Sequence, residues 1–128
     1  MPRQRLIILT LLLFVILPST TNAKDFYFNP PDEYKRKKIK PNDVYEICSD
    51  YIQHSSVSYT FKSSLPLNFN IHYHIKDFAI YPVLSDGIKQ ASGIYKTPFT
   101  YEFCFMWTNN NSKPVHMIHK INLIQGSR

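Results

Sequence analysis

Two stretches of this chain alternate between apolar and polar residues, and this period of two constrains the fold more than any other feature. The stretches cover residues 67–76 and 99–108. Because successive side chains of a strand point to opposite faces, each stretch predicts a strand with one face on a core and one on solvent. The residues predicted to face the core are Leu67, Phe69, Ile71, Tyr73 and Ile75 in the first strand, and Phe99, Tyr101, Phe103, Phe105 and Trp107 in the second.

Shorter segments that read as strands surround these two stretches. They are residues 44–48, 57–62, 79–83, 93–95 and 115–124. Turn-forming residues separate them, notably at residues 63–66, 85–87 and 109–114. No helical periodicity intervenes, and nine Tyr and nine Phe favour strands. The pattern predicts an all-β fold, an antiparallel β-sandwich of about seven to eight strands over residues 43–128.

The N-terminal residues 1–23 have the three parts of a secretory signal. Arg3 and Arg5 precede an apolar segment at residues 6–17, and Ala23 ends a small-x-small cleavage site. The apolar segment is shorter than the roughly 20 residues that a membrane-spanning helix needs. We therefore expect a cleaved signal peptide and export to the periplasm or the cell exterior, with no transmembrane segment in the mature chain. An uncleaved N-terminal anchor is the alternative.

Residues 24–42 form a basic, proline-containing segment. The run from Lys35 to Lys40 holds five basic side chains, and like charges at this density repel one another. We expect an extended or disordered arm. It is either a solvated tail or the source of a weak electrostatic contact with an anionic surface such as lipid head groups. The expected exported location disfavours nucleic acid as a partner.

The two cysteines, Cys48 and Cys104, each fall in a predicted strand. In an oxidising compartment two cysteines favour a disulfide, which would stabilise the fold by about 4 kcal/mol in the chain-entropy model. Two free buried thiols or a catalytic thiol are the alternatives. A catalytic cysteine needs a helix start or a neighbouring base, and no helix is predicted.

The second half of the chain resembles the end of a GOLD domain, the lumenal β-sandwich of the p24 (emp24) family. The resemblance rests on Gly93-Ile94-Tyr95, on Tyr101-Glu102-Phe103-Cys104-Phe105 and on the Asn-rich turn at residues 109–112, and extends over about residues 44–124. It implies a sandwich, a second cysteine near the start of the domain where Cys48 stands, and a non-catalytic binding role. Residues 69–74 depart from the p24 pattern, and no coiled coil or membrane span follows the last strand, so cargo traffic is not implied.

Four histidines suggest a metal site. His72 and His74 lie two apart in a predicted strand, so both project from its polar face. His116 and His119 lie three apart in the last strand and point to opposite faces unless a bulge intervenes. Imidazole ligands suit zinc or copper, and a thioether suits Cu(I); the thioether candidates are Met106 and Met117. The histidines could converge only if the last strand lies beside residues 67–76. The alternative is a set of surface histidines.

Trp107 continues the apolar face of its strand, which predicts a core position, with a partly exposed anchor for a partner as the alternative. Asn110 begins an Asn-x-Ser glycosylation sequon on a turn. Neither paired carboxylates nor a Ser/His/Asp arrangement can be recognised. The sequence therefore predicts an exported, non-enzymatic binding module with a protein partner. A periplasmic or extracellular protein that binds Cu or Zn through His72 and His74 is the alternative.

Overall fold

The computed structural model describes residues 33–126, which contain only strands and connecting loops. The expected signal peptide and the first part of the basic segment lie outside these residues. The strands are β1 (Lys35–Ile39), β2 (Val44–Tyr51), β3 (Ser56–Ile75), β4 (Phe78–Lys96), β5 (Tyr101–Thr108) and β6 (Val115–Gln125). In this described part of the chain there is no helix long and apolar enough to cross a membrane.

All six strands belong to one antiparallel sheet. Its order is β1-β6-β3-β5-β2, and β4 pairs with β3 over almost the whole length of both. The first part of β3 also pairs with β6, and the second part pairs with β5. Strand β3 therefore pairs with β4 on one side and with β6 and then β5 on the other, so it links the two parts of the sheet.

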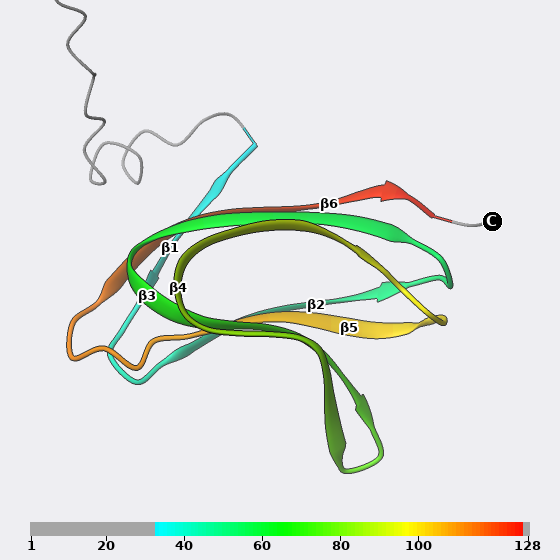
Figure 1. Ribbon diagram of the computed structural model, residues 1–128, viewed down its shortest axis with the longest axis horizontal. Helices are drawn as coiled ribbons and strands as arrows, with labels where there is room; N and C mark the ends of the chain where they lie inside the picture. The colour runs from blue at the N-terminus through cyan, green and yellow to red at the C-terminus, as the bar shows by residue number, and fades with distance from the viewer. Residues whose placement is uncertain (1–32, 127–128) are drawn as a thin grey trace, which may run out of the picture.

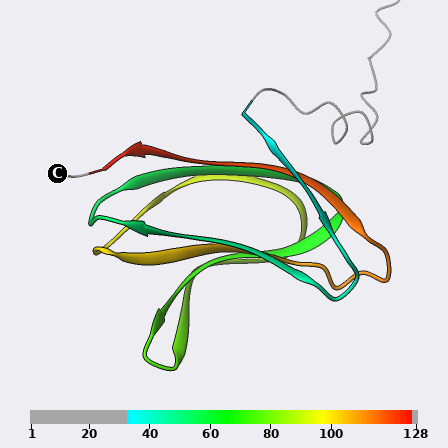
Figure 2. The same cartoon turned by 180° about the vertical axis from the view of Figure 1, so that it is seen from behind.

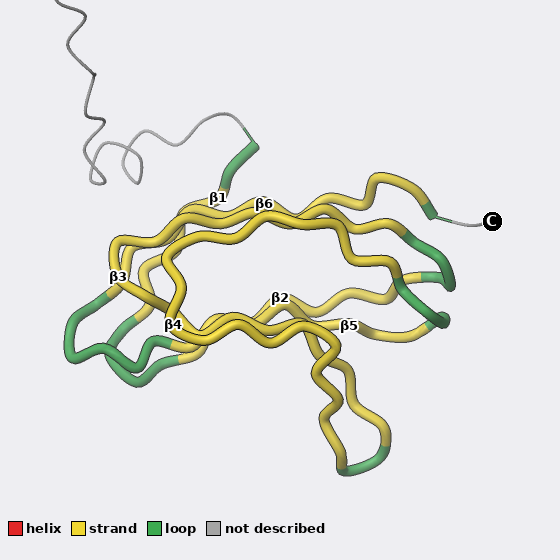
Figure 3. Tube along the Cα trace, viewed as in Figure 1, coloured by secondary structure: helices red, strands yellow, loops and turns green. Residues whose placement is uncertain are grey.

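The sheet curls over on itself because β3 and β4 bend together. Their pairing shifts register between Lys62 and Leu67, and irregularities of this kind bend strands and increase their twist. The result is a half-barrel with two layers (Figure 1). The upper layer contains β1, β6 and one half each of β3 and β4, and the lower layer contains β2, β5 and the other halves. The same layers are visible from behind (Figure 2), with loops gathered at the two ends (Figure 3).

The structure corrects the expected turn at residues 63–66, because these residues continue β3 through the bend. It also has fewer and longer strands than expected, with 20 residues in β3 and 19 in β4. Ser and Pro at the bend resemble a turn locally, but pairing with the long neighbouring strand keeps the chain extended.

Part of the basic segment also belongs to the sheet. Lys35–Ile39 forms β1 and pairs in register with Val115 to His119 of β6, so these residues belong to the sheet and the folded part begins before residue 43. Lys35 to Lys38 are exposed, and Ile39 is buried in the core. Burial of Ile39 and pairing with the edge of β6 help to order a segment whose charge is typical of a solvated tail.

The core lies between the two layers. The predicted inward faces of β3 and β5 are confirmed for Leu67, Phe69 and Ile71 and for Phe103, Phe105 and Trp107, all buried. Towards the end of β3, Tyr73 is only half-buried and Ile75 is exposed. The fully buried apolar residues of the described chain include Ile39, Val57, Phe61, Leu67, Phe69, Ile71, Phe103, Phe105, Trp107, Val115, Met117 and Ile118.

Asn109 ties the loop between β5 and β6 to β1. Its buried side-chain amide donates hydrogen bonds to the backbone carbonyls of Ile39, Lys40 and Lys113, at 3.0, 3.2 and 2.9 Å. A buried amide with these partners is satisfied, whereas leaving it unpaired would cost about 1–3 kcal/mol. The predicted Asn-rich turn therefore also fixes the edge strand.

Candidate functional site

The expected disulfide is present, and it joins two neighbouring strands of the lower layer. Cys48 of β2 and Cys104 of β5 are directly opposite in the antiparallel register, with their Cα atoms 4.1 Å apart. The bond lies on the outer face of the sheet, since the flanking residues Phe103 and Phe105 point into the core.

His72 extends this pair into a row. It is directly opposite Cys104 on the other side of β5, so Cys48, Cys104 and His72 occupy one line across three adjacent strands. Although the row is on the outer face, His72 is only 3% exposed and Cys104 only 2%. Neighbouring side chains therefore cover most of the row.

The imidazole of His72 is held between two polar side chains. Its Nδ1 lies 2.8 Å from the amide oxygen of Asn70, which can only accept, so Nδ1 carries the hydrogen and donates. Its Nε2 then bears a lone pair and lies 3.2 Å from a carboxylate oxygen of Glu46. Two acceptors face each other at this point unless a cation, either a proton or a metal ion, lies between them.

The environment of His72 acts on its pKa in both directions. Burial lowers the pKa most, the Glu46 carboxylate opposes this, and the neighbouring His74 lowers it further. The net effect is a pKa below the ordinary value of 6.5. A lowered pKa favours the neutral imidazole at neutral pH, which is the form that binds metals.

Glu46 is a site residue that the sequence analysis missed. The same carboxylate oxygen lies 3.2 Å from Cys48 Sγ, which carries no hydrogen in the disulfide. Glu46 is exposed and sits two residues before Cys48, on the same face of β2. Its proximity to His72 arises from pairing between distant strands, and no local sequence pattern signals it.

The remaining metal-site candidates divide between the two layers. His74 is exposed and its ring centroid lies 5.0 Å from that of His72, while Met106 is opposite both Glu46 and Asn70. Met117 is buried in the core. β6 pairs with residues 56–63 of β3 and not with residues 67–76, so His116 and His119 belong to the upper layer. The condition under which the four histidines could converge, a last strand beside residues 67–76, is therefore not met.

His119 points into the core from β6. Its Nε2 shares a 3.2 Å hydrogen bond with the Tyr45 hydroxyl, and its ring packs against Trp107 at 5.5 Å between centroids. Burial, with smaller contributions from the charges of Lys35 and Lys37, lowers its pKa to about 4. His119 is therefore a neutral core residue at neutral pH.

Trp107 is a core residue and not the exposed partner anchor that the sequence left open. It is 1% exposed and packs against Tyr45, Phe61 and Phe69, at centroid distances of 5.7, 5.8 and 5.4 Å. A residue with this burial is not available to a partner. Asn110, the sequon residue, is exposed on its loop.

The exposed apolar surface that the sequence analysis missed is the tip of the β3–β4 hairpin. The hairpin projects below the lower layer (Figure 1), and β5 does not pair with β3 beyond His72. Its tip carries four large exposed apolar residues, which we call the tip patch: Ile75, Phe78, Ile80 and Tyr81. Phe78 is 71% exposed and Tyr81 46%. Lys76, at a φ of 53°, and Asp77 form the two-residue turn.

The base of the hairpin is anchored by aromatic packing. The Tyr73 ring meets Phe99 and Phe103 at centroid distances of 5.1 and 5.4 Å, both edge to face. Edge-to-face pairs of this kind stabilise by about 0.5–1.5 kcal/mol beyond burial. The hairpin is therefore held at its base, where the Tyr81 ring also lies 5.5 Å from the ring of His72, and it is exposed at Ile75 and Phe78.

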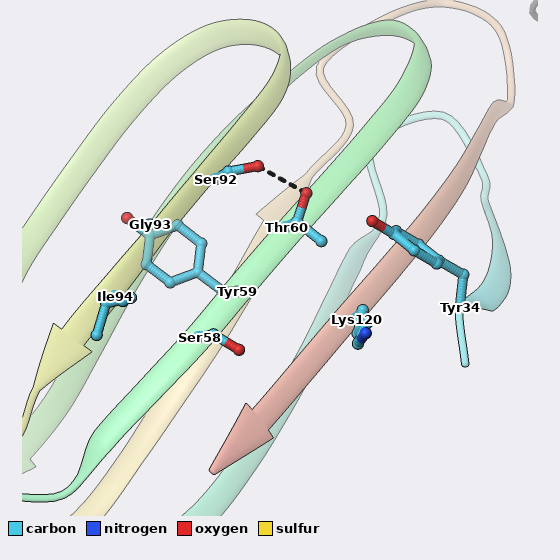
Figure 4. Close-up of a pocket in the computed structure, with 8 residues that line it drawn as sticks. All are labelled: Tyr34, Ser58, Tyr59, Thr60, Ser92, Gly93, Ile94 and Lys120. Carbon is cyan, nitrogen blue, oxygen red and sulfur yellow. Dashed lines mark hydrogen bonds between the residues drawn. The ribbon is translucent and has the colours of Figure 1, made fainter. Parts of the chain in front are cut away.

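The upper layer has a shallow surface hollow of different character (Figure 4). Its volume is about 390 Å³ and five of its eight lining residues carry a hydroxyl group, with Thr60 and Ser92 sharing a 2.7 Å hydrogen bond. The Tyr59 ring covers Gly93, where an added Cβ would lie 2.5 Å from the Tyr59 hydroxyl oxygen. Lys120, at the rim, is paired with Glu33.

Comparison with known proteins shows the fold and no family. No family model and no curated protein matches the chain. Among solved structures, PliG of Aeromonas hydrophila, a periplasmic inhibitor of g-type lysozyme, is similar at a TM-score of 0.51 and 14% identity, over 70% of this chain and 84% of that one.

Two further structures share the architecture. A mitogen derived from Yersinia pseudotuberculosis is similar at a TM-score of 0.56 and 8% identity, over 74% of this chain and 87% of that one. PirA is similar at a TM-score of 0.53 and 12% identity, over 72% of this chain and 95% of that one. None of the three is named as an enzyme. At these identities the likeness concerns the β-rich fold alone, and the GOLD resemblance stays a prediction.

Proposed function

We propose that this chain is an exported, non-enzymatic binding module that engages a protein partner through the tip patch of the β3–β4 hairpin. The observation that carries the proposal is the exposure of Ile75, Phe78, Ile80 and Tyr81 on a segment that projects from the sheet.

Exposed apolar side chains are ordinary when scattered, but several on one projecting element mark an interaction surface. Aromatic residues are enriched at the buried centres of protein interfaces, and Phe78 and Tyr81 would supply them here. An isolated two-stranded hairpin is marginally stable in water, so burial against a partner would stabilise the tip.

The shape of the hairpin indicates the kind of partner. A narrow convex element with apolar sides fits a concave apolar site better than a flat surface, so the partner would be a protein with an apolar cleft. The similar fold of PliG, an inhibitor of g-type lysozyme, supports the use of this architecture against a protein target.

Site-specific photocrosslinking tests this function. A photoreactive phenylalanine analogue is placed at Phe78 or, as the matched control, at Ile94, which is 67% exposed on the upper layer. With the exported proteins of the source organism, we expect a discrete adduct from position 78 only. Excess wild-type protein should compete for it, and a Phe78→Asp/Tyr81→Asp variant should not. Equal adducts from both positions, or equal competition, would contradict the proposal.

Export and the GOLD-like sandwich belong to the same proposal. The disulfide supports an oxidising location. N-terminal sequencing of the protein from a culture should begin at Lys24, and an intact Met1 would indicate an anchor. The exposed basic side chains of Lys35–Lys40 are proposed to add a weak contact with anionic surfaces, which vesicles with anionic lipid should show at low salt and lose at high salt.

A further inference from the structure

The row of side chains on the outer face of the lower layer has the composition of a metal site as well as of a disulfide. Cys48, Cys104 and His72 lie in register on β2, β5 and β3, and Glu46 stands beside them. Potential ligand atoms of Glu46, His72 and Cys104 all lie within 4.8 Å of one another. While the disulfide is intact, its sulfurs are not thiolates and this set is incomplete.

We propose that reduction of the Cys48–Cys104 disulfide converts this row into a Zn²⁺ site with ligands from Cys48, Cys104, His72 and Glu46, so that the disulfide and the bound metal are mutually exclusive states of one site. The inference does not depend on the tip patch or on the identity of a protein partner.

The ligand types match what zinc selects. Zn²⁺ prefers four ligands in a tetrahedral arrangement and accepts thiolate, imidazole and carboxylate donors. Two thiolates, one imidazole and one carboxylate provide such a set, and three of the four residues are fixed by strand pairing. The strand register already holds the two cysteine side chains side by side.

The orientation of His72 is an independent argument for a cation. Metal-bound histidines usually donate their second ring N–H to an oxygen acceptor, which fixes the ring and its tautomer. The bond from His72 Nδ1 to the Asn70 amide oxygen, at 2.8 Å, is of this type. It directs the Nε2 lone pair toward Glu46 and Cys104, where a cation would relieve the repulsion between two acceptors.

The interconversion balances with a dithiol as the reductant. The dithiol gives two electrons and two protons to the protein disulfide, breaking the S–S bond and forming two thiols, while the reductant becomes a disulfide. Zn²⁺ then displaces the two thiol protons as the Zn–S bonds form. Reoxidation requires the reverse loss of the metal, so bound zinc should protect the cysteines from oxidation.

The test uses Co²⁺ as a spectroscopic probe for zinc on the purified exported protein. After reduction and removal of the reductant under anaerobic conditions, we expect one equivalent of Co²⁺ to give thiolate-to-cobalt charge-transfer absorption and tetrahedral ligand-field bands. Added Zn²⁺ should displace the Co²⁺ and so remove both absorption signals. The oxidised protein should show neither signal. Native mass spectrometry of the reduced protein should give one zinc per chain, with the loss of two protons.

Variants distinguish the proposed four-ligand site from a site in which the two cysteines alone bind the metal. His72→Ala should abolish the tetrahedral bands or weaken affinity more than 100-fold. Asn70→Leu, which removes only the orienting hydrogen bond, should weaken affinity about 10- to 100-fold. His116→Ala, in the upper layer, is the matched control and should bind like the wild type.

Folding is followed by circular dichroism in the same samples. If the reduced chain unfolds, one equivalent of Zn²⁺ should refold the wild type and not His72→Ala. The proposal is overturned if reduced wild type takes up no stoichiometric metal, if His72→Ala binds as tightly as wild type, or if zinc neither refolds an unfolded reduced chain nor slows reoxidation of a folded one.

Discussion

The two layers of the half-barrel share β3 and β4, yet their outer faces differ. The outer face of the upper layer carries hydroxyl and Lys side chains and the exposed Ile94 around a shallow hollow. The outer face of the lower layer carries the disulfide, the buried His72 and the base of the projecting hairpin. The residues to which we assign the proposed function and the proposed zinc site therefore all belong to the lower layer and its hairpin.

The largest expected effect comes from a residue that joins the layers. Trp107 contacts Tyr45 of the lower layer and Phe61 of the upper layer, so Trp107→Ala leaves a cavity between them. We expect a loss of about 3–5 kcal/mol in the free energy of unfolding, measured by urea denaturation. A loss below about 1 kcal/mol would mean that the layers do not depend on this contact.

Removing the disulfide should affect the layers unequally. Cys48→Ala/Cys104→Ala should lower the free energy of unfolding by about 4 kcal/mol in the chain-entropy model. Hydrogen exchange should accelerate more in β2 and β5 than in β1 and β6, because only the former are linked by the bond. Equal acceleration in both pairs would show that the disulfide stabilises the fold as a whole.

The two buried histidines, His72 in the lower layer and His119 in the upper layer, should make the free energy of unfolding depend on pH. The pKa of His119 is about 4 in the folded protein and near 6.5 when unfolded, so the unfolded state binds more protons between these values. The free energy of unfolding should therefore fall as the pH drops from about 6.5 to 4, by about 3 kcal/mol in total. His119→Phe should remove most of this slope in denaturation curves, leaving that of His72 on the outer face. An unchanged slope would contradict the buried, neutral state of His119.

The smallest effect on stability should come from the hairpin tip. Phe78 is 71% exposed, so Phe78→Ser should change the free energy of unfolding by no more than about 0.5 kcal/mol, as should Ile94→Ser on the upper layer. Phe78→Ser should weaken competition for the partner in the crosslinking experiment whereas Ile94→Ser should not, and the two variants should have similar melting temperatures. A destabilisation above 1 kcal/mol for Phe78→Ser would show that the tip packs against this chain.

The sequence alone predicted the features that depend on the local order of residues, such as which side chains of a strand face the core. Period-two alternation identified the inward residues Phe69 and Ile71, and the presence of only two cysteines identified the disulfide. The bend in β3 was missed because its turn-like residues are kept extended by pairing with β4. Strand β1 was missed because these residues become ordered only by pairing with the edge of β6, which is distant in the sequence.

The residues of the candidate site likewise divide into those that local spacing identified and those that only the pairing of distant strands brings together. His72 and His74 were recognised by their spacing, which fixes a common face. Glu46 was not, because its approach to His72 depends on two successive strand registers, β2 on β5 and β5 on β3. The distribution of His116 and His119 away from this site depends on which half of β3 pairs with β6, and a single sequence does not contain that information.

Strand β1 bears on how the protein behaves at high concentration. It ends the sheet on one side, and its outer residues Lys35 to Lys38 are all basic and exposed. An edge strand offers unpaired backbone groups to any other chain, and repulsion between such edges prevents them from joining. We therefore expect charge repulsion along the basic run to disfavour amyloid-like pairing of two such edges, and neutralisation of these charges to favour fibre growth from this edge.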